Sequence, residues 1–253
     1  MQTLIIAEAG KNFLDENESL YRARELALVA KNCGADAVKY QCHVSDELPK
    51  RDKSRHEWIL LNEKLTPDTF WKSLKEYCDT IGMEFMVTPM SLSAAQKMNP
   101  LVKRWKVASP DINDWPMLGF LKSTEKEIII STGMSYPDEV GVTKKLLPDA
   151  KYLHCISEYP VPIERLNLNM VLYRDGLSDH TMSLIAGAMA VALNASIIEK
   201  HFTINNWGKD AHMSLSPEQL KIYIDNIREA EKAIIKTDLP TEKEIELRRT
   251  FRP

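Results

Sequence analysis

The stretch LSDHTMSLIAGAMAVALNASIIEKHFT (177–203) contains two short strand-like runs, which end near His180 and His201. An almost wholly apolar segment of helical character separates the two runs. This order predicts a strand, a helix and a second strand, which together form one β–α–β unit. The rest of the chain decides how many such units exist and where the two histidines meet.

Short apolar runs alternate with amphipathic stretches along the whole chain. The runs are nearly continuous in apolar residues, as burial on both faces of a parallel sheet requires. Between them, stretches such as ESLYRARELALVAKNCG (18–34) show helical spacing of leucine and alanine, with Gly34 as a stop. Eight strands are expected, at LIIAEAG (4–10), AVKYQ (37–41), EFMVTPM (84–90), RWKVASPD (104–111), EIIISTGM (127–134), YLHCISEYP (152–160), GLSDHT (176–181) and SIIEKHFT (196–203).

Eight strand–helix units in a chain of 253 residues predict an α/β fold of the (β/α)₈ TIM-barrel type. The competing doubly wound sheet usually opens with a glycine-rich phosphate-binding turn, whereas AEAGKNF (7–13) has one glycine. We expect a TIM-barrel catalytic domain over residues 1–240 and a C-terminal helical tail over 241–253. The charged segment 44–65 is interpreted as a long loop that either is a solvated surface or closes the site.

The composition argues against several classes of protein. The net charge of −3 at pH 7 disfavours a nucleic-acid partner. No apolar run approaches the roughly 20 residues of a membrane span, and MQTLIIAEAG (1–10) lacks the basic region of a signal peptide. The four cysteines are scattered without a CxxC pair, as in reduced cytosolic proteins. We therefore expect a cytoplasmic protein without membrane association.

Each of the eight runs turns polar at its C-terminal end. In a parallel barrel these ends lie on one face, where such folds carry their active sites. A helix cap or a satisfied core group would explain any one residue, but capping alone explains eight polar ends poorly. The polar residues are Glu8; Lys39 and Gln41; Thr88; Lys106, Ser109 and Asp111; Ser131 and Thr132; Ser157, Glu158 and Tyr159; Ser178, Asp179 and His180; Glu199, Lys200 and His201.

The two histidines of the opening stretch end neighbouring strands, so their imidazoles are expected to approach each other at the barrel mouth. Neutral His180 and His201 can share a divalent metal there, with a carboxylate such as Glu8 completing the shell directly or through water. Two histidines with oxygen ligands suit Mn, Fe or Co better than a closed structural zinc site. The alternative is that one or both histidines only form hydrogen bonds within the rim.

Lysines and hydroxyl groups indicate what the site works on. Lys39 and Lys106 end strands two and four, and a lysine inside a barrel is costly unless it is paired. A phosphate or carboxylate ligand would offset that cost, and the serines at the strand ends are neutral donors for such an anion. A Schiff-base lysine, as in a class I aldolase, is the rival interpretation, but the metal site and hydroxyls favour a phosphorylated anionic substrate.

Nine stretches follow one another in an order that defines a known family. They are IIAEAGKN (5–12), GADAVKYQ (34–41), EFMVTP (84–89), WKVAS (105–109), IIISTGM (128–134), LHCISEYPVP (153–162), GLSDHT (176–181), AVALNASIIEKHFT (190–203) and GKDAHMSLSPEQL (208–220). The set resembles the sialic acid synthase family, whose members join phosphoenolpyruvate to N-acetylmannosamine or a related amino sugar. The combination of STGM, HC-x-S-x-YP, SDHT and EKHFT makes the resemblance specific.

The resemblance implies a metal-assisted condensation to a nonulosonic acid with release of phosphate. It implies Mn²⁺, Mg²⁺ or Co²⁺ on His180 and His201, with Mn²⁺ as the first choice. Glu8 is expected to be the acid/base or to orient the metal-bound water, and Lys39 and Lys106 to neutralise the substrate anion. The resemblance assigns Lys39, Thr88, Lys106, Ser109, Ser131, Ser157 and Ser178 to phosphoenolpyruvate, and Glu8, Gln41, Asp111, Tyr159 and Asp210 to the sugar or the reacting centre.

The departures from the family concern the sugar side, so the acceptor stays open. The chain reads VTPMS (87–91) for the usual STPFD, Asp111 for a common Glu, and GKDA (208–211) for the frequent GPDH. Family members continue into a small antifreeze-like domain that reaches across a dimer, whereas this sequence stops at RRTFRP (248–253). Such a domain could be absent, separately encoded or outside this sequence, and a homodimer is expected from the family.

Two other functions remain as alternatives. One is a different aldolase-type TIM barrel, including one that forms a lysine Schiff base. The other is a ligand-binding barrel subunit that needs a partner domain for activity.

Overall fold

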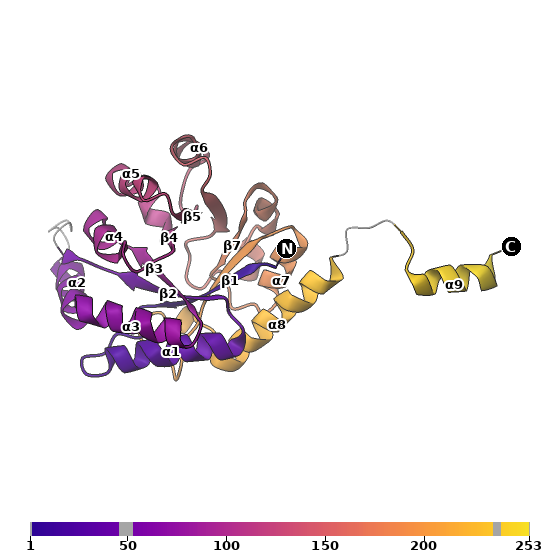
Figure 1. Cartoon of the computed structure of the whole chain (residues 1–253). Helices are drawn as coiled ribbons and strands as arrows, with labels where there is room; N and C mark the ends of the chain where they lie inside the picture. Colours follow the sequence, from indigo (N-terminus) through magenta and orange to yellow (C-terminus); the bar gives the residue numbers. More distant parts are fainter. Residues whose placement is uncertain (1, 46–52, 235–238, 253) are drawn as a thin grey trace.

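Eight parallel strands form a nearly closed barrel in the computed structural model, which describes residues 2–45, 53–234 and 239–252, without the side chains of 53–56 (Figure 1). The hydrogen-bonded order is β3-β2-β1-β8-β7-β6-β5-β4. The predicted TIM barrel is therefore confirmed. The strands are β1 (Leu4–Gly10), β2 (Ala37–Cys42), β3 (Glu84–Pro89), β4 (Arg104–Val107), β5 (Glu127–Ser131), β6 (Lys151–Cys155), β7 (Gly176–Asp179) and β8 (Ile197–His201).

Helices surround the barrel and connect successive strands (Figure 1). The α-helices are α1 (Ser19–Cys33), α2 (Lys53–Leu65), α3 (Asp68–Thr80), α4 (Leu92–Met98), α5 (Trp115–Ser123), α6 (Pro137–Leu146), α7 (Ala186–Ala192), α8 (Pro217–Ala233) and α9 (Glu242–Phe251). The 3₁₀ turns η2 (Ser109–Asp111), η3 (Ile163–Arg165), η4 (Leu168–Tyr173) and η5 (Ala211–Met213) lie in the loops. Helix α1 ends as expected, because Gly34 takes a left-handed conformation at φ 92° and its N–H caps the last turn.

Six strands, β3 to β8, end earlier than the sequence predicted, and β4, β5 and β6 do so by three to five residues. Strand β4 stops at Val107 because the next residues form η2, whose Pro110 has no N–H to donate to a sheet. Strands β5 and β6 stop at Ser131 and Cys155, so the polar residues that follow them lie in loops.

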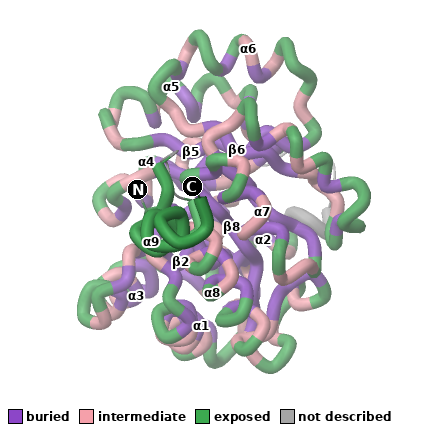
Figure 2. The backbone as a smooth tube through the Cα atoms, turned by 90° about the vertical axis from the view of Figure 1, so that its right-hand side faces the viewer, coloured by how far each residue is buried: buried purple, intermediate pink, exposed green. Residues whose placement is uncertain are grey.

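The interpretation of 44–65 as one long loop was wrong, because α2 covers Lys53–Leu65. Part of the charge of this segment, including Lys50 and Arg51, lies outside the described residues. The expected tail contains α9, which stands apart from the barrel and has no buried residue (Figures 1 and 2).

The barrel interior is layered along its axis. An apolar layer at the bottom consists of Ile6, Ala37, Met86, Ile129, Leu153 and Ile197. Because side chains alternate along a strand, the residues two positions further on point the same way. These are Glu8, Lys39, Thr88, Ser131, Cys155 and Glu199, and all are buried. The sequence therefore builds a polar layer directly above an apolar floor.

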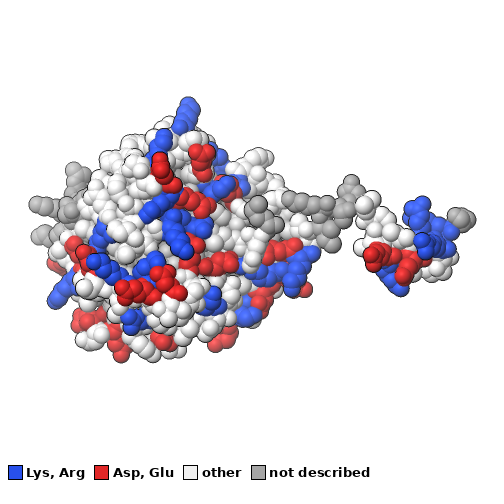
Figure 3. Space-filling view, viewed as in Figure 1, with Lys and Arg blue, Asp and Glu red and all other residues white. Residues whose placement is uncertain are grey.

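The outward-facing side chains of the strands pack under the helices in the main hydrophobic core, and buried backbone dominates the barrel in Figure 2. Acidic and basic side chains are intermixed over the face shown in Figure 3. Within the described residues, no helix is both long and apolar enough to cross a membrane.

Candidate active site

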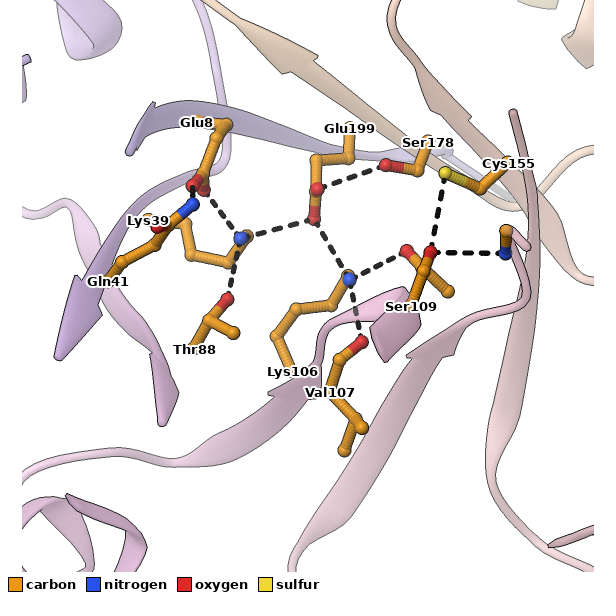
Figure 4. A network of polar contacts seen from close by, with 12 residues as sticks. Glu8, Lys39, Gln41, Thr88, Lys106, Val107, Ser109, Cys155, Ser178 and Glu199 are labelled. Atoms are coloured by element: carbon orange, nitrogen blue, oxygen red, sulfur yellow. Dashed lines mark hydrogen bonds and ion pairs between the residues drawn. The ribbon is translucent and has the colours of Figure 1, made fainter. Parts of the chain in front are cut away.

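Two lysines and two glutamates form a buried cluster in the polar layer (Figure 4). The ammonium nitrogen of Lys39 lies 2.5 Å from Glu8 Oε2 and 3.6 Å from Glu199 Oε2, and it donates to Thr88 Oγ1 at 2.7 Å. Lys106 lies 3.8 Å from the same Glu199 oxygen. Glu199 thus links the two lysines.

Hydroxyl and amide groups complete the cluster. Lys106 donates to Ser131 Oγ at 2.7 Å, and Ser178 donates to Glu199 Oε1 at 3.1 Å. Gln41 donates to Glu8 Oε1 at 3.3 Å. These contacts come from six different strands, so the closed barrel is needed to bring the groups together.

The environment moves the pKa values of the four ionisable groups. Burial, aided by the negative charge of Glu199 and opposed by Lys39, raises the pKa of Glu8 to about 7. Burial lowers the pKa of Lys106. Burial acts against the charged forms of Lys39 and Glu199, but their mutual attraction and the neighbouring charges outweigh it, raising the pKa of Lys39 and lowering that of Glu199. Glu8 is therefore able to gain or lose a proton near neutral pH.

The two buried lysines are already paired with carboxylates of the same chain. We expected an external anion to offset their burial, yet Glu8 and Glu199 already pair with them inside the chain. Burial of Lys39 and Lys106 alone does not require a ligand. When Glu8 is protonated, however, two ammonium groups face one carboxylate, and this excess positive charge favours an anion.

A cradle of small polar groups lies beside Lys106. A Cβ atom on Gly133 would lie 2.3 Å from Ser157 Oγ, 2.8 Å from Ser109 Oγ and 3.1 Å from Cys155 Sγ. The Gly133 N–H donates to Ser109 Oγ at 3.0 Å. Glycine at this position therefore lets the two serine hydroxyls pack directly against the backbone, where any larger residue would clash.

His180 and His201 meet at the mouth as expected, with ring centroids 5.5 Å apart. The Nδ1 atom of His180 lies 2.8 Å from the carbonyl oxygen of Ile156, which only a protonated nitrogen can contact favourably, so Nε2 retains the lone pair of the neutral ring. Burial lowers the pKa of His201 well below its usual value, and its buried Nδ1 has no hydrogen-bond partner among the described residues.

The two imidazoles therefore offer nitrogen lone pairs of the kind that a divalent metal binds. Within the described ranges, no three His, Cys, Asp or Glu side chains converge as a metal site does. A metal on the two histidines would thus take its remaining ligands from water or substrate. The predicted metal fits the donor chemistry of these residues and stays a prediction.

A second row of polar groups lies on the opposite face of the same strand ends. Lys200 Nζ lies 2.9 Å from Asp179 Oδ2, and both side chains are fully buried. Tyr223 of α8 donates to the same carboxylate oxygen at 2.9 Å. This ion pair holds β7 and β8 against α8, behind the two histidines, and it does not enter the cavity.

The cavity at the mouth has a volume of about 60 Å³. Of the predicted site residues, Glu8, Lys39, Gln41, Thr88, Lys106, Ser109, Ser131, Tyr159, Ser178, His180 and His201 line it. Ser157 lies next to it in the glycine cradle. Asp210 lies at its edge, since a Cβ atom on Gly10 would be 2.6 Å from Asp210 Oδ2 and 3.5 Å from Glu8 Oε1.

Asp111, predicted to be catalytic, does not line the cavity, whereas Ser109 and Pro110 of the same turn η2 do. Glu199 and Cys155 line it but were not among the predicted site residues. Side-chain alternation could have identified Glu199, because it lies two residues before His201 on the same strand face. The same alternation marks Cys155, which lies two residues after Leu153 of the apolar layer and two before the predicted Ser157.

The chain is a TIM barrel whose mouth holds a buried lysine–glutamate cluster, serine hydroxyls packed around Gly133, and a histidine pair. The NeuB family model matches residues 26–238, and the chain belongs to this family. N,N'-diacetyllegionaminic acid synthase of Legionella pneumophila is 33% identical over 284 residues, covering 100% of this chain and 79% of that protein.

Two further comparisons agree. Human N-acetylneuraminate-9-phosphate synthase is 29% identical over 257 residues, covering 91% of this chain and 70% of that protein. The crystal structure of N-acetylneuraminic acid (sialic acid) synthetase from Leptospira borgpetersenii, in complex with citrate, superposes with a TM-score of 0.88 at 25% identity. That superposition covers 100% of this chain and 93% of the other, so the predicted family is confirmed over the barrel.

Proposed function

We propose that this protein condenses phosphoenolpyruvate with an N-acyl amino sugar to give a nonulosonic acid and phosphate. The observation that carries the proposal is the buried cluster of Lys39, Lys106, Glu8 and Glu199 next to the Gly133 cradle. Membership of the NeuB family and likeness to nonulosonic acid synthases support it.

In the proposed reaction, the methylene carbon of phosphoenolpyruvate forms a bond to the C1 aldehyde carbon of the open-chain sugar. Water then adds to C2 of the enolpyruvyl unit, and the C2–O bond breaks to release phosphate. The water oxygen becomes the C2 carbonyl oxygen and gives up both of its protons. One balances the proton gained by the aldehyde oxygen, and the other leaves with the phosphate, so no oxidant or reductant is needed.

Each residue of the mouth has a role in this proposal. Lys39 and Lys106 neutralise the phosphate and carboxylate, while Ser109 and the Gly133 cradle orient the anion. Glu8, with its pKa of about 7, gives a proton to the aldehyde oxygen and can take one from water. A divalent metal on the two histidines, Mn²⁺ before Mg²⁺ or Co²⁺, would polarise the aldehyde as a Lewis acid.

The experiment follows phosphate release and product mass after the purified chain is incubated with phosphoenolpyruvate, Mn²⁺ and a panel of N-acyl amino sugars. Phosphate together with a nonulosonic acid supports the proposal. If phosphoenolpyruvate neither binds nor releases phosphate under any condition, the proposed reaction is wrong.

Schiff-base chemistry is the second candidate, because burial lowers the pKa of Lys106 and so favours a neutral amine. Borohydride trapping of a carbonyl substrate on Lys106, with no dependence on metal, would replace the first proposal by the second.

We also propose a homodimer in the cytoplasm. The four cysteines are free and buried, which suits a reducing compartment. Sedimentation of the purified chain tests the dimer.

A further inference from the structure

A second pocket, of about 280 Å³, lies on the same face of the barrel as the reaction cavity. It is formed by the loop after β1, by α2 and by the loop after β8, and we call it the Trp58 pocket. Trp58, Leu14, Leu61 and Leu65 provide its apolar walls. Trp58, Leu61 and Leu65 belong to segment 44–65, which the sequence left as either a solvated surface or a closure of the site.

The two cavities share a wall. Lys11 lines the Trp58 pocket and lies 3.8 Å from Asp210, whose other carboxylate oxygen is next to Gly10 and close to Glu8 of the reaction cavity. The reaction cavity, at about 60 Å³, is small for both an enolpyruvyl phosphate and a six-carbon sugar. A substrate that extends from Glu8 past Asp210 reaches the larger pocket.

Helix α2 is held against the residues that follow β2. His43 packs edge-on against Trp58, with ring centroids 5.0 Å apart. Glu63 accepts a hydrogen bond from the backbone N–H of Ser45 at 3.2 Å. The indole is therefore a fixed wall and not a freely moving surface side chain.

The charges that line the Trp58 pocket cancel. Lys11 and Lys209 contribute +2, and Asp15 and Glu16 contribute −2, which gives zero. Asp15 is further paired with Arg22 at 2.7 Å. A neutral pocket with apolar walls disfavours a phosphate group, because no excess positive charge is present to replace its lost hydration.

The pocket nevertheless offers hydrogen-bond donors, because two ammonium groups lie over its aromatic wall. The ammonium nitrogens of Lys11 and Lys209 lie 5.0 and 4.9 Å from the Trp58 ring centroid. A small group with a methyl to pack on the indole and a carbonyl oxygen to accept from a lysine matches both features. An N-acyl group has this chemistry.

We propose that the Trp58 pocket binds a neutral N-acyl group on the half of the acceptor sugar remote from the aldehyde, so that the protein selects diacylated over phosphorylated acceptors. This specificity rests on the proposed condensation. The proposed selectivity defines the class of acceptor sugar, which the sequence left open.

The test compares three acceptors: a diacetamido hexose, N-acetylmannosamine and N-acetylmannosamine 6-phosphate. We expect kcat/KM to be highest for the diacetamido hexose, by about tenfold, and lowest for the phosphate, because one apolar contact in a pocket discriminates by roughly 10–200-fold. Trp58→Ala should remove the preference for the diacetamido hexose while the KM for phosphoenolpyruvate stays unchanged.

Two further variants distinguish loss of the pocket from a general folding defect. Leu61→Glu changes a residue that is 40% exposed, and it should reduce use of the diacetamido hexose in the same way as Trp58→Ala. Tyr21→Ala, at an exposed aromatic residue that lines neither cavity, should match the wild type. A wild-type preference for the 6-phosphate, or equal losses for all three acceptors in Trp58→Ala, would overturn the proposal.

A binding measurement separates this inference from the proposed reaction. Saturation-transfer NMR should show the acyl methyl protons of the diacetamido hexose in contact with the wild type and not with Trp58→Ala. If that contact is seen without any phosphate release, the pocket assignment stands and the proposed condensation fails. If release occurs but the contact does not depend on Trp58, the condensation stands and the pocket assignment fails.

Discussion

Replacing Glu199 by glutamine should destabilise the fold strongly, because Glu199 neutralises two buried ammonium groups. Its Oε2 atom lies 3.6 Å from Lys39 and 3.8 Å from Lys106, and all three side chains are at most 5% exposed. At an effective dielectric constant of about 20, each such pair attracts by about 4–5 kcal/mol before desolvation is subtracted. Removing one partner of a buried ion pair costs about 3–5 kcal/mol.

We expect E199Q to lose about 3–5 kcal/mol of unfolding free energy at pH 7, measured by urea denaturation followed by circular dichroism. Glu127→Gln is the matched control, since Glu127 pairs with Arg104 at 2.6 Å but its side chain is 39% exposed. That variant should lose less than about 1 kcal/mol. If the two variants lose the same free energy within about 1 kcal/mol, our account of the buried cluster is wrong.

The effect should also depend on pH. Folding lowers the pKa of Glu199 below its ordinary value of 4.5, since Lys106 and Lys39 outweigh its burial. The resulting stability is present above that ordinary value and is lost as pH falls through the folded pKa. The difference between wild type and E199Q should therefore be full at neutral pH and shrink in acid.

Burial raises the pKa of Glu8 to about 7, so protonated Glu8 stabilises the fold below pH 4.5 and this contribution is lost as pH rises through 7. The unfolding free energy of the wild type, measured relative to that of E8Q, should therefore fall by about 3 kcal/mol across this range. Removal of metal with EDTA should abolish phosphate release by the wild type, and added Mn²⁺ should restore it. His180→Ala or His201→Ala should weaken metal binding by about 100-fold, measured by calorimetry. Gly133→Ala should raise the KM for phosphoenolpyruvate at least about tenfold, because its Cβ would lie 2.3 Å from a serine oxygen. Gly119→Ala, whose Cβ meets nothing within 4 Å in α5, should leave that KM unchanged and add about 0.5–1 kcal/mol of stability.

The barrel could be predicted because each strand is a continuous apolar run, and such runs have few other stable arrangements. Strand ends were less predictable. SPD (109–111) looks like a continuation of β4 in sequence, but its proline cannot join a ladder and the chain turns there. Segment 44–65 looked like a loop because of its charges, although Trp58, Leu61 and Leu65 recur at the spacing of an amphipathic helix.

Which residues form ion pairs at the mouth was harder to predict than which residues lie there. The sequence shows that Lys39 and Lys106 end two strands. Which carboxylates neutralise these lysines depends on which strands lie near each other in the barrel. Glu199 reaches both lysines only because β8 lies beside β1 and the barrel curves toward β4. Such contacts between residues far apart in sequence follow from closure of the sheet.

Strands β3 and β4 are the two ends of the hydrogen-bonded order, so the ring has a seam between them. Thr88 ends one side of that seam and Lys106 the other, and both line the reaction cavity. An anion held between them would bridge the seam. Ligand binding should therefore slow amide hydrogen exchange along β3 and β4 more than along β7, because the bound anion would link the two strands that no backbone ladder joins.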